Sequence, residues 1–189
     1  MEKSLKKILV GITGASGSVY AYCFLKELKE LDIPSEVIIT KAGEYVLKKE
    51  LGFSLGNLKN LCLKVYTEEE FYAPPASGSS NYSAMVVIPC SMGTVGAIAS
   101  GISRNLLQRA ADVMLKEKKP LVLVVRETPL NVIHLKNLLT CAEAGATVFP
   151  ASPAFYQKPK NLEELINFFV QRLSFFLGLR DNLSNHWQP

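Results

Sequence analysis

The chain has 189 residues, of which 48% are apolar, so it is long enough to bury a sizeable core and too apolar to be disordered. The formal net charge is +4, and the lysines and arginines are scattered instead of forming the basic stripe of a nucleic-acid-binding protein. No apolar run approaches the roughly 20 residues of a membrane span, and the N-terminus does not resemble a signal peptide. We therefore expect one cytoplasmic domain that binds neither nucleic acid nor a membrane.

Five short apolar runs, rich in β-branched side chains, are typical of strands buried on both faces. In chain order they are Lys7–Ile12, Ser35–Thr40, Ala84–Pro89, Leu121–Arg126 and Ala146–Phe149. Segments with helical periodicity alternate with them: Ser18–Leu31, Gly43–Leu51, Gly93–Ala99, Asn105–Lys118, Leu130–Ala144 and Leu162 to about Leu177. The alternation predicts an α/β fold, a Rossmann-like doubly wound parallel sheet in three layers (α/β/α), with its ligand outside the carboxyl ends of the strands.

The first strand ends in Gly11-Ile-Thr-Gly-Ala-Ser-Gly17, a G-x-x-G-x-x-G turn that leads into a helix. Such a turn presents backbone N–H groups at a helix N-terminus, where a phosphate binds. The spacing departs from the dinucleotide G-x-G-x-x-G, and Thr13 and Ser16 add hydroxyls. We interpret it as a site for a mononucleotide or a flavin phosphate. The alternative is a glycine turn that only packs the helix on the strand.

A long segment of turn residues, Phe71–Asn81, carries two aromatic side chains. Long loops in compact domains are usually functional or disordered, so this one is either a lid over the ligand or a mobile surface loop. A second hydroxyl-rich turn, Cys90–Thr94, follows the third predicted strand. Two such turns on adjacent strands are able to hold one ligand between them. Cys90 is a weak candidate nucleophile, because no neighbouring histidine or charge activates it.

The four cysteines are far apart and form no C-x-x-C pair, and the chain has two histidines; these residues are Cys23, Cys62, Cys90, Cys141, His134 and His186. This pattern argues against a zinc site. Free cysteine behaves as a small hydrophobe, so we expect buried free thiols and no metal.

Charged residues recur in two places. Arg109, Asp112 and Lys116 share one face of a predicted helix, where they form either a solvated charge ladder or an anion site. Arg126 and Glu127 end the fourth predicted strand, at the edge where ligands bind. The arginine suits a phosphate or a flavin carbonyl, whereas the glutamate either moves protons or pairs with an arginine.

The last predicted helix, about 161–178, is apolar on more than one face. One stripe faces a core; a second, with Phe168 and Phe175, has Arg172 between its aromatics. A helix that is apolar nearly all round is buried on several sides, so its outer face lies either at an interface with another subunit or inside the same chain. At an interface, Arg172 needs an anionic partner.

Six motifs, in order between about residue 6 and residue 178, resemble the flavin prenyltransferases of the homo-oligomeric flavin-containing superfamily. This family was formerly described as phenylacrylic-acid or polyprenyl-hydroxybenzoate decarboxylases. The motifs are Thr13–Gly17, Ala73–Ser79, Cys90–Thr94, Arg109–Glu117, Arg126–Leu130 and Pro153–Tyr156.

The resemblance implies a single flavoprotein domain over residues 1–189. It also implies an enzyme that joins the dimethylallyl group of dimethylallyl phosphate to N5 and C6 of reduced FMN without a metal. A partner decarboxylase then uses the prenylated FMN, for example in ubiquinone biosynthesis. The family assembles as trimers packed into a dodecamer with shared sites, which agrees with an interface at helix 161–178.

The resemblance also assigns roles to residues of this sequence. FMN contacts are implied for Gly14, Ala15, Ser16, Thr40, Ser91, Met92, Gly93, Thr94 and Arg126. The prenyl phosphate would be held by Lys116, Tyr156 and Arg172, with Arg109 close by, and the implied catalytic residues are Ser16, Glu50 and Glu127. Thr40, Glu50 and Tyr156 also fit a plain strand end, a helix-end charge and a surface aromatic. Phe71 stands where some members have tryptophan.

Two other functions remain open at this stage. A flavin-dependent cysteine decarboxylase of the same superfamily needs a catalytic histidine after the first helix, and both histidines of this chain come late. A non-catalytic FMN-binding subunit would not need Lys116, Tyr156 and Arg172 together.

Overall fold

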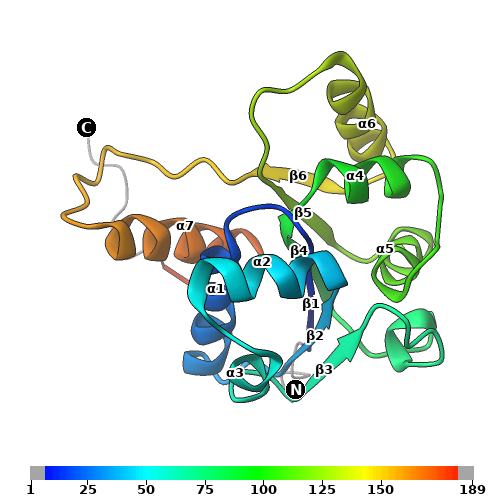
Figure 1. Ribbon diagram of the computed structural model, residues 1–189, viewed down its shortest axis with the longest axis horizontal. Helices are drawn as coiled ribbons and strands as arrows, with labels where there is room; N and C mark the ends of the chain where they lie inside the picture. The colour runs from blue at the N-terminus through cyan, green and yellow to red at the C-terminus, as the bar shows by residue number, and fades with distance from the viewer. Residues whose placement is uncertain (1–6, 183–189) are drawn as a thin grey trace.

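Six strands form one parallel sheet in the computed structural model, which describes residues 7–182 (Figure 1). The order across the sheet is β3-β2-β1-β4-β5-β6, and every neighbouring pair is parallel. The strands are β1 (Ile8–Ile12), β2 (Ser35–Ile39), β3 (Lys64–Thr67), β4 (Ala84–Cys90), β5 (Leu121–Val125) and β6 (Thr147–Pro150). The predicted Rossmann-like, doubly wound sheet is confirmed.

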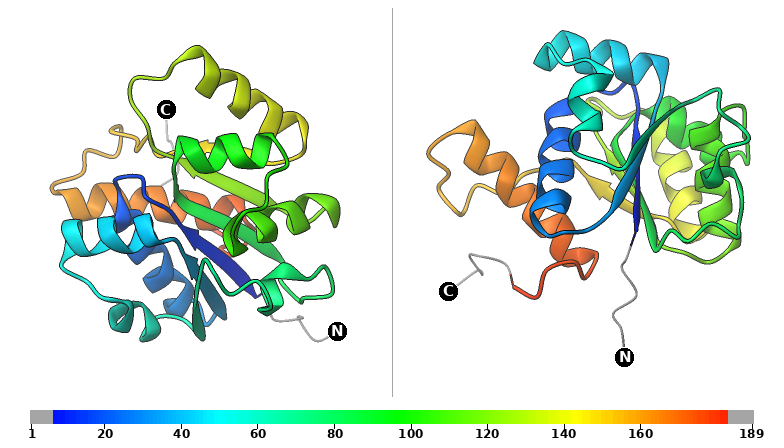
Figure 2. Two further views of the ribbon diagram at one scale, coloured as in Figure 1. Left: turned by 45° about the vertical axis from the view of Figure 1, so that its right-hand side comes forward. Right: turned by 90° about the horizontal axis from the view of Figure 1, so that it is seen from below.

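Helices cover both faces of the sheet and complete the three layers (Figure 2). On one face lie α1 (Ser18–Glu30), α2 (Lys41–Leu51), α3 (Leu55–Lys59) and α7 (Leu162–Phe176). On the other lie α4 (Met92–Ala99), α5 (Leu106–Lys116) and α6 (Val132–Glu143). None of the helices in residues 7–182 is long and apolar enough to cross a bilayer.

The four central strands are buried along their whole length, which explains why their sequences are apolar apart from Ser35 and Glu36 at the start of β2. The edge strand β3 was not predicted, because its sequence Lys-Val-Tyr-Thr has no apolar run and it is largely exposed. Helix α3 and the short 3₁₀ helix Pro74–Ala76 were missed for a similar reason, since three to five residues carry too little periodicity. The 3₁₀ helix lies in the loop predicted to be either a lid or mobile.

Side-chain caps decide where several helices begin. The Thr40 side chain accepts a hydrogen bond from the Gly43 backbone N–H at 3.0 Å, so α2 begins at Lys41, two residues before the predicted start. Ser91 caps α4 in the same way, so α4 begins at Met92, one residue before the predicted start. Both caps lie at the carboxyl end of a strand, so the residues that end strands also begin helices.

All four cysteines are free, as expected, with Cys90 and Cys141 buried and Cys23 and Cys62 half-buried. Burial raises the pKa of the Cys90 thiol above its ordinary value. This argues against a nucleophilic Cys90, because the thiolate is the reactive form. Within residues 7–182 no group of three or more His, Cys, Asp and Glu side chains could hold a metal ion. His186 lies outside the described residues.

Candidate functional site

The sheet reverses its winding between β1 and β4, which are neighbours, and a doubly wound sheet binds its ligand outside the carboxyl ends of the strands at such a point. Thr13, directly after β1, ties the two strand ends together. Its hydroxyl donates to the Pro89 carbonyl at 2.7 Å and accepts from the Ser91 backbone N–H at 2.8 Å. The turns after β1 and β4 are therefore adjacent, as the sequence predicted. Thr13 was noted as a hydroxyl but was not expected to have this role.

Glu50, near the end of α2, reaches across to the start of α1. Its carboxylate accepts from the Gly17 backbone N–H at 3.0 and 3.1 Å and from the Ser18 backbone N–H at 2.8 Å. A carboxylate is stabilised at a helix N-terminus, where N–H groups lack partners. Because a carboxylate of the same chain occupies these groups, the structure argues against the phosphate interpretation of this turn.

Ser16 joins the same cluster. Partial burial raises the pKa of Glu50, but hydrogen bonds from Ser16, Ser18 and Gly17 outweigh it, so the pKa lies below its ordinary value. Glu50 is therefore ionised at neutral pH and holds the Ser16 side chain. Arg126, after β5, donates from Nε to the Ser16 carbonyl at 3.0 Å. The structure thus brings Ser16, Glu50 and Arg126 together from three segments distant in sequence.

Two glycines of the first turn have structural reasons to be there. Gly17 has φ 110°, in the left-handed region that favours glycine. A Cβ on Gly14 would lie 2.6 Å from the Ala42 Cβ, so Gly14 is needed for the approach of α2. Ala15 is buried beside it.

Glu127, which was predicted either to move protons or to pair with an arginine, accepts a hydrogen bond from the Thr128 backbone N–H at 3.0 Å. Its described contacts include no arginine.

The second turn presents an open helix start. The Ser91 hydroxyl caps α4 by accepting from the Thr94 backbone N–H at 3.3 Å, and it contacts the Thr94 hydroxyl at 3.1 Å. The N–H groups of Met92 and Gly93, in the first turn of α4, have no acceptor within the helix. Apart from the residues next to it and the backbone of α4 itself, no heavy atom lies within 4 Å of the place where a Gly93 Cβ would stand. An anionic or carbonyl oxygen of a ligand fits at this position.

Two cations of α5 lie against the loop that precedes β4. Arg109 donates from Nε to the Ala76 carbonyl at 3.2 Å, and its Nη1 pairs with Asp112 at 2.7 Å. Lys116 pairs with Glu117. A Cβ on Gly78 would lie 2.2 Å from Glu117 Oε1 and 3.0 Å from Lys116 Nζ, so the loop passes very close to this pair. This contact joins segments distant in the chain and was not predicted.

The remaining predicted phosphate ligands lie elsewhere. Tyr156 and Arg172 line a groove of about 440 Å³ beside α7, where the Tyr156 ring packs edge-on against Phe168. Helix α7 packs on the face of the sheet that α1 covers, whereas α5 packs on the opposite face. One chain therefore does not bring Lys116 and Arg109 together with Tyr156 and Arg172.

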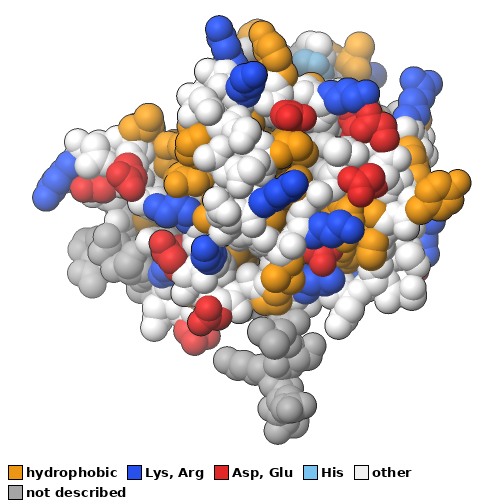
Figure 3. Space-filling model, turned by 60° about the horizontal axis from the view of Figure 1, so that its bottom comes forward, with side chains coloured by type: hydrophobic (Ala, Val, Ile, Leu, Met, Phe, Trp, Pro, Cys, Tyr) orange, Lys and Arg blue, Asp and Glu red, His pale blue; other side chains and the backbone are white. Residues whose placement is uncertain are grey.

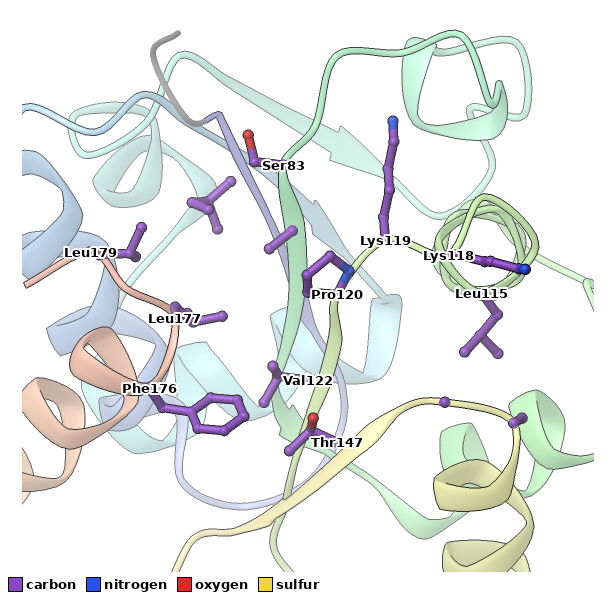
Figure 4. A pocket seen from close by; sticks show the side chains of 14 residues that line it. Ser83, Leu115, Lys118, Lys119, Pro120, Val122, Thr147, Phe176, Leu177 and Leu179 are labelled. Atoms are coloured by element: carbon purple, nitrogen blue, oxygen red, sulfur yellow. The ribbon is translucent and has the colours of Figure 1, made fainter. Parts of the chain in front are cut away.

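A hollow of about 700 Å³ opens at the other end of the sheet, next to the amino ends of β1, β4 and β5 (Figure 4). Lys118, Lys119 and Pro120 line one side, and Phe176, Leu177 and Leu179 the other. None of the predicted site residues lines it. Because the hollow holds none of these residues, we place the candidate site at the carboxyl end of the sheet, where the two turns meet.

On the face drawn in Figure 3, basic and acidic side chains are interspersed.

A Rossmann-like sheet with two hydroxyl-rich turns at its switch point defines a nucleotide- or flavin-binding protein. The family model described as Flavoprotein matches residues 1–174. The chain is thus a member of the flavoprotein class.

Relatives narrow the class. The flavin prenyltransferase UbiX of Methanocaldococcus jannaschii is 44% identical over 96% of this chain and 98% of its own length, and that of Aquifex aeolicus is 43% identical over 97% of this chain and 100% of its own. The chain therefore belongs to the flavin prenyltransferase UbiX family.

Two solved structures share the fold over nearly the whole chain. The crystal structure of AnUbiX (PadA1) in complex with FMN and dimethylallyl pyrophosphate has a TM-score of 0.90 at 39% identity, covering 97% of this chain and 99% of that one. A dodecameric FMN-dependent UbiX-like decarboxylase from Escherichia coli has a TM-score of 0.92 at 34% identity, covering 97% and 100%.

Proposed function

We propose that this chain transfers a dimethylallyl group from dimethylallyl phosphate to N5 and C6 of reduced FMN, in the cytoplasm. The product, prenylated FMN, would serve a partner decarboxylase. The observation that carries the proposal is the convergence of Ser16, Glu50 and Arg126 with the open start of α4 at one end of the sheet. A relative that binds FMN together with dimethylallyl pyrophosphate supports it.

The residues at the two turns suit FMN. The N–H groups of Met92 and Gly93 and the hydroxyls of Ser91 and Thr94 offer donors beside an open space. Ala15 and the backbone of Gly14 form the neighbouring surface, and Arg126 and Thr40 border it from β5 and β2. The Thr40 hydroxyl oxygen accepts the hydrogen bond that caps α2, so the hydroxyl is left to donate a hydrogen bond to a ligand. When bound, reduced FMN supplies the nucleophilic ring atoms.

Ser16 and Glu50 form the proposed proton path. The ionised Glu50 carboxylate orients the Ser16 hydroxyl, and a proton released near Ser16 can pass through Oγ to the carboxylate. Glu127 is the second proposed proton acceptor, because its carboxylate follows Arg126 at the end of β5. Geometry favours Glu50, which is the residue in contact with the turn.

Lys116, Arg109, Tyr156 and Arg172 are the proposed ligands of the prenyl phosphate. As the carbon–oxygen bond of the allylic phosphate breaks, negative charge builds up on the departing phosphate. Fixed cations and a phenol hydroxyl stabilise that charge without reorganising. Apolar walls keep water from the allylic carbon, and Phe71 is a proposed part of those walls.

The split of these four ligands requires a second copy of the chain. Because α5 and α7 lie on opposite faces of the sheet, a complete phosphate site forms where one copy's Tyr156 and Arg172 meet the turns of another. We propose trimers with shared sites that assemble into a dodecamer, the state of the Escherichia coli relative. Arg172 then finds in the substrate phosphate the anionic partner that an arginine at an interface needs.

The test is to mix the purified protein with reduced FMN and dimethylallyl phosphate and to record the product mass. A gain of one prenyl unit is expected, whereas FMN that binds without a mass change would make this a non-catalytic flavin-binding subunit. A parallel reaction with dimethylallyl diphosphate shows which of the two allylic phosphates is the substrate.

The alternative function, a flavin-dependent cysteine decarboxylase, is tested with a cysteine-terminated peptide as the substrate. In this chain His134 helps to cap α6 with Asn131 and lies far along the chain from α1.

A further inference from the structure

Two helices that carry site residues lie on opposite faces of the sheet (Figure 2). Helix α2 starts directly after Thr40 and holds Glu50 against the start of α1. Helix α5 carries two cations, Arg109 and Lys116. Under the proposed function the flavin lies beside α2 and the prenyl phosphate beside α5. The reaction therefore requires that the two helices keep a fixed separation.

Glu68, directly after β3, joins the starts of these two helices. Its Oε1 accepts a hydrogen bond from the Lys41 backbone N–H, the first of α2, at 3.0 Å, and its Oε2 accepts from Asn105 Nδ2 at 3.0 Å. Its own carbonyl accepts from the Leu106 backbone N–H, the first of α5, at 2.8 Å. One half-buried residue thus supplies acceptors to the first N–H groups of two helices, which have no acceptor inside either helix.

The side chain of Asn105 is oriented for this contact. Its Oδ1 accepts from the Gln108 backbone N–H at 2.9 Å and caps α5, so its amide nitrogen is left to donate to Glu68. Together these contacts make a continuous hydrogen-bonded chain between the first turn of α5 and the first residue of α2. Both ends of the chain are backbone donors, so its two side chains must supply an acceptor at each end and one donor–acceptor pair in the middle.

The bridge also anchors the loop that runs along α5. Further along the chain from Glu68, the Ala76 carbonyl accepts from Arg109 at 3.2 Å, and the backbone at Gly78 passes close to Lys116. The loop therefore follows α5 from its start to its last residue, with Glu68 at one end. Displacing the start of α5 displaces Arg109 and the loop with it.

We propose that Glu68 is a positioning residue of the transfer reaction. It fixes α5, with the cations that hold the prenyl phosphate, relative to α2 and the flavin beside it. This inference rests on the proposed function, and Glu68 acts through the two helices instead of touching a substrate. When the bridge is broken, the phosphate still binds to α5, but its allylic carbon lies out of line with the flavin ring. A misplacement of about 1 Å costs up to about a hundredfold in rate.

An exchange of donor and acceptor tests the bridge. In Glu68→Gln an amide replaces the carboxylate, and whichever way the amides at positions 68 and 105 turn, two donors face each other at one point of the chain. In Asn105→Asp two carboxylates face each other and repel. The double variant restores every hydrogen bond, because the new amide donates to the new carboxylate and both ends keep an acceptor.

The rate of prenylated FMN formation is measured with reduced FMN and dimethylallyl phosphate. Each single variant is expected to lose about tenfold in kcat, and the double variant should recover at least about half of the wild-type value. The KM for dimethylallyl phosphate and the dissociation constant of FMN should stay within about twofold of wild type. A merely structural role would lower the melting temperature without this loss in kcat. Wild-type kcat in a folded Glu68→Gln, or a double variant no faster than the single variants, would overturn the proposal.

Glu69→Gln is the matched control, since it removes the same charge one residue further along the chain. Glu69 pairs with Lys41 Nζ at 2.5 Å, and both side chains are more than half exposed. An exposed ion pair contributes little, so kcat should equal that of wild type. A tenfold loss in this control would attribute the effect to charge and contradict the bridge.

Circular dichroism and melting curves establish that the variants are folded. If Asn105→Asp alone fails to fold, Asn105→Ser takes its place in the kinetic comparison, because serine caps a helix but lacks the amide donor. The same tenfold loss in kcat is expected, and wild-type kcat in Asn105→Ser contradicts the bridge.

The melting curves also separate the two proposals. If wild type forms no prenylated FMN, the proposed function fails, and the role of Glu68 in transfer fails with it. The bridge itself is still decided by the double-mutant cycle. The double variant is expected to melt above both single variants, and any other order contradicts the bridge.

Discussion

The two ends of the sheet handle charge in opposite ways. At the amino end, Glu36 of β2 is buried and satisfied within the chain: Tyr66 donates to it at 3.0 Å, Tyr82 donates to the same oxygen, and Lys7 pairs with the other oxygen at 3.0 Å. Burial, followed by the nearby carboxylate, raises the pKa of Tyr66 to about 12. Burying a charge is tolerated when hydrogen bonds and an opposite charge compensate it.

At the carboxyl end, charged side chains are exposed and keep capacity for a ligand. Arg126 uses Nε on the Ser16 carbonyl, and at the start of α4 the N–H groups of the first turn have no acceptor within the helix and Gly93 is exposed. Arg172 stands in a groove at the edge of the chain. At the amino end, all of these hydrogen bonds are made within the chain, and they stabilise the fold. At the carboxyl end, donors are left without partners in the described part of the chain, and a ligand bound there would complete their hydrogen bonds.

The largest expected effect comes from Arg172→Ala, which removes a charge from the open end. We expect prenyl transfer to fall about a thousandfold, the scale of a lost transition-state donor, while FMN binding and the melting temperature stay unchanged. Product mass measures prenyl transfer, and a fluorescence titration with FMN measures FMN binding. Lys160→Ala, which removes a cation outside the groove, is the control. Loss of FMN from a folded Arg172→Ala would contradict the assignment.

Glu50→Gln tests whether the carboxylate over the first turn is a proton acceptor. An amide is not basic, so we expect the transfer rate to fall about a hundredfold, with FMN still bound. The pKa of Glu50 is lowered, so wild-type activity should decline only in acid, as the carboxylate becomes protonated. In the variant this acid decline should disappear. Glu44→Gln, on the same helix, should behave as wild type; an unchanged rate in Glu50→Gln would make the residue purely a helix cap.

Glu36→Gln addresses the closed end and should leave transfer unchanged while lowering the free energy of unfolding by about 2 kcal/mol. The pKa of Glu36 is lowered in the folded state: burial raises it, and hydrogen bonds from Tyr82, Lys7 and Tyr66 outweigh this. Its stabilisation is therefore complete above its ordinary pKa of 4.5 and is lost as pH falls through the folded value.

Urea unfolding of Glu36→Gln and wild type at pH 7 and pH 3 measures this difference. The gap should be largest at pH 7 and should shrink in acid. Glu30→Gln, an exposed residue of α1, is the control and should leave stability unchanged at both pH values. A constant gap would mean that the charge of Glu36 contributes nothing.

The smallest expected effect is that of Gly78→Ala, which disturbs the contact between the loop and α5. The added methyl group must displace Glu117 and Lys116, whose side chains are flexible and half-exposed. We expect a threefold to tenfold loss in kcat/KM for dimethylallyl phosphate, mainly through KM. Gly56→Ala, in α3, is the control. An unaltered KM would separate this loop from the phosphate site.

Local sequence determined the elements whose pattern is strong. The buried strands and the longer helices were predicted to within about two residues, because continuous apolar runs and helical periodicity are visible in one dimension. The edge strand Lys64–Thr67 was not predicted, because a strand that is mostly exposed has a polar sequence similar to that of a loop. The motifs that resemble a known family supplied the site residues, and the relatives confirmed that family.

Contacts between distant segments could not be predicted. No spacing reveals that Glu50 caps α1 across 32 residues, that Thr13 ties β1 to β4, or that Lys116 and Arg172 lie on opposite faces. The sequence by itself determined the α/β class, the two hydroxyl-rich turns and the chemistry of the residues around them. Tertiary structure alone decided which of those residues meet, because hydrogen bonds and packing depend on distances in space that sequence separation does not encode.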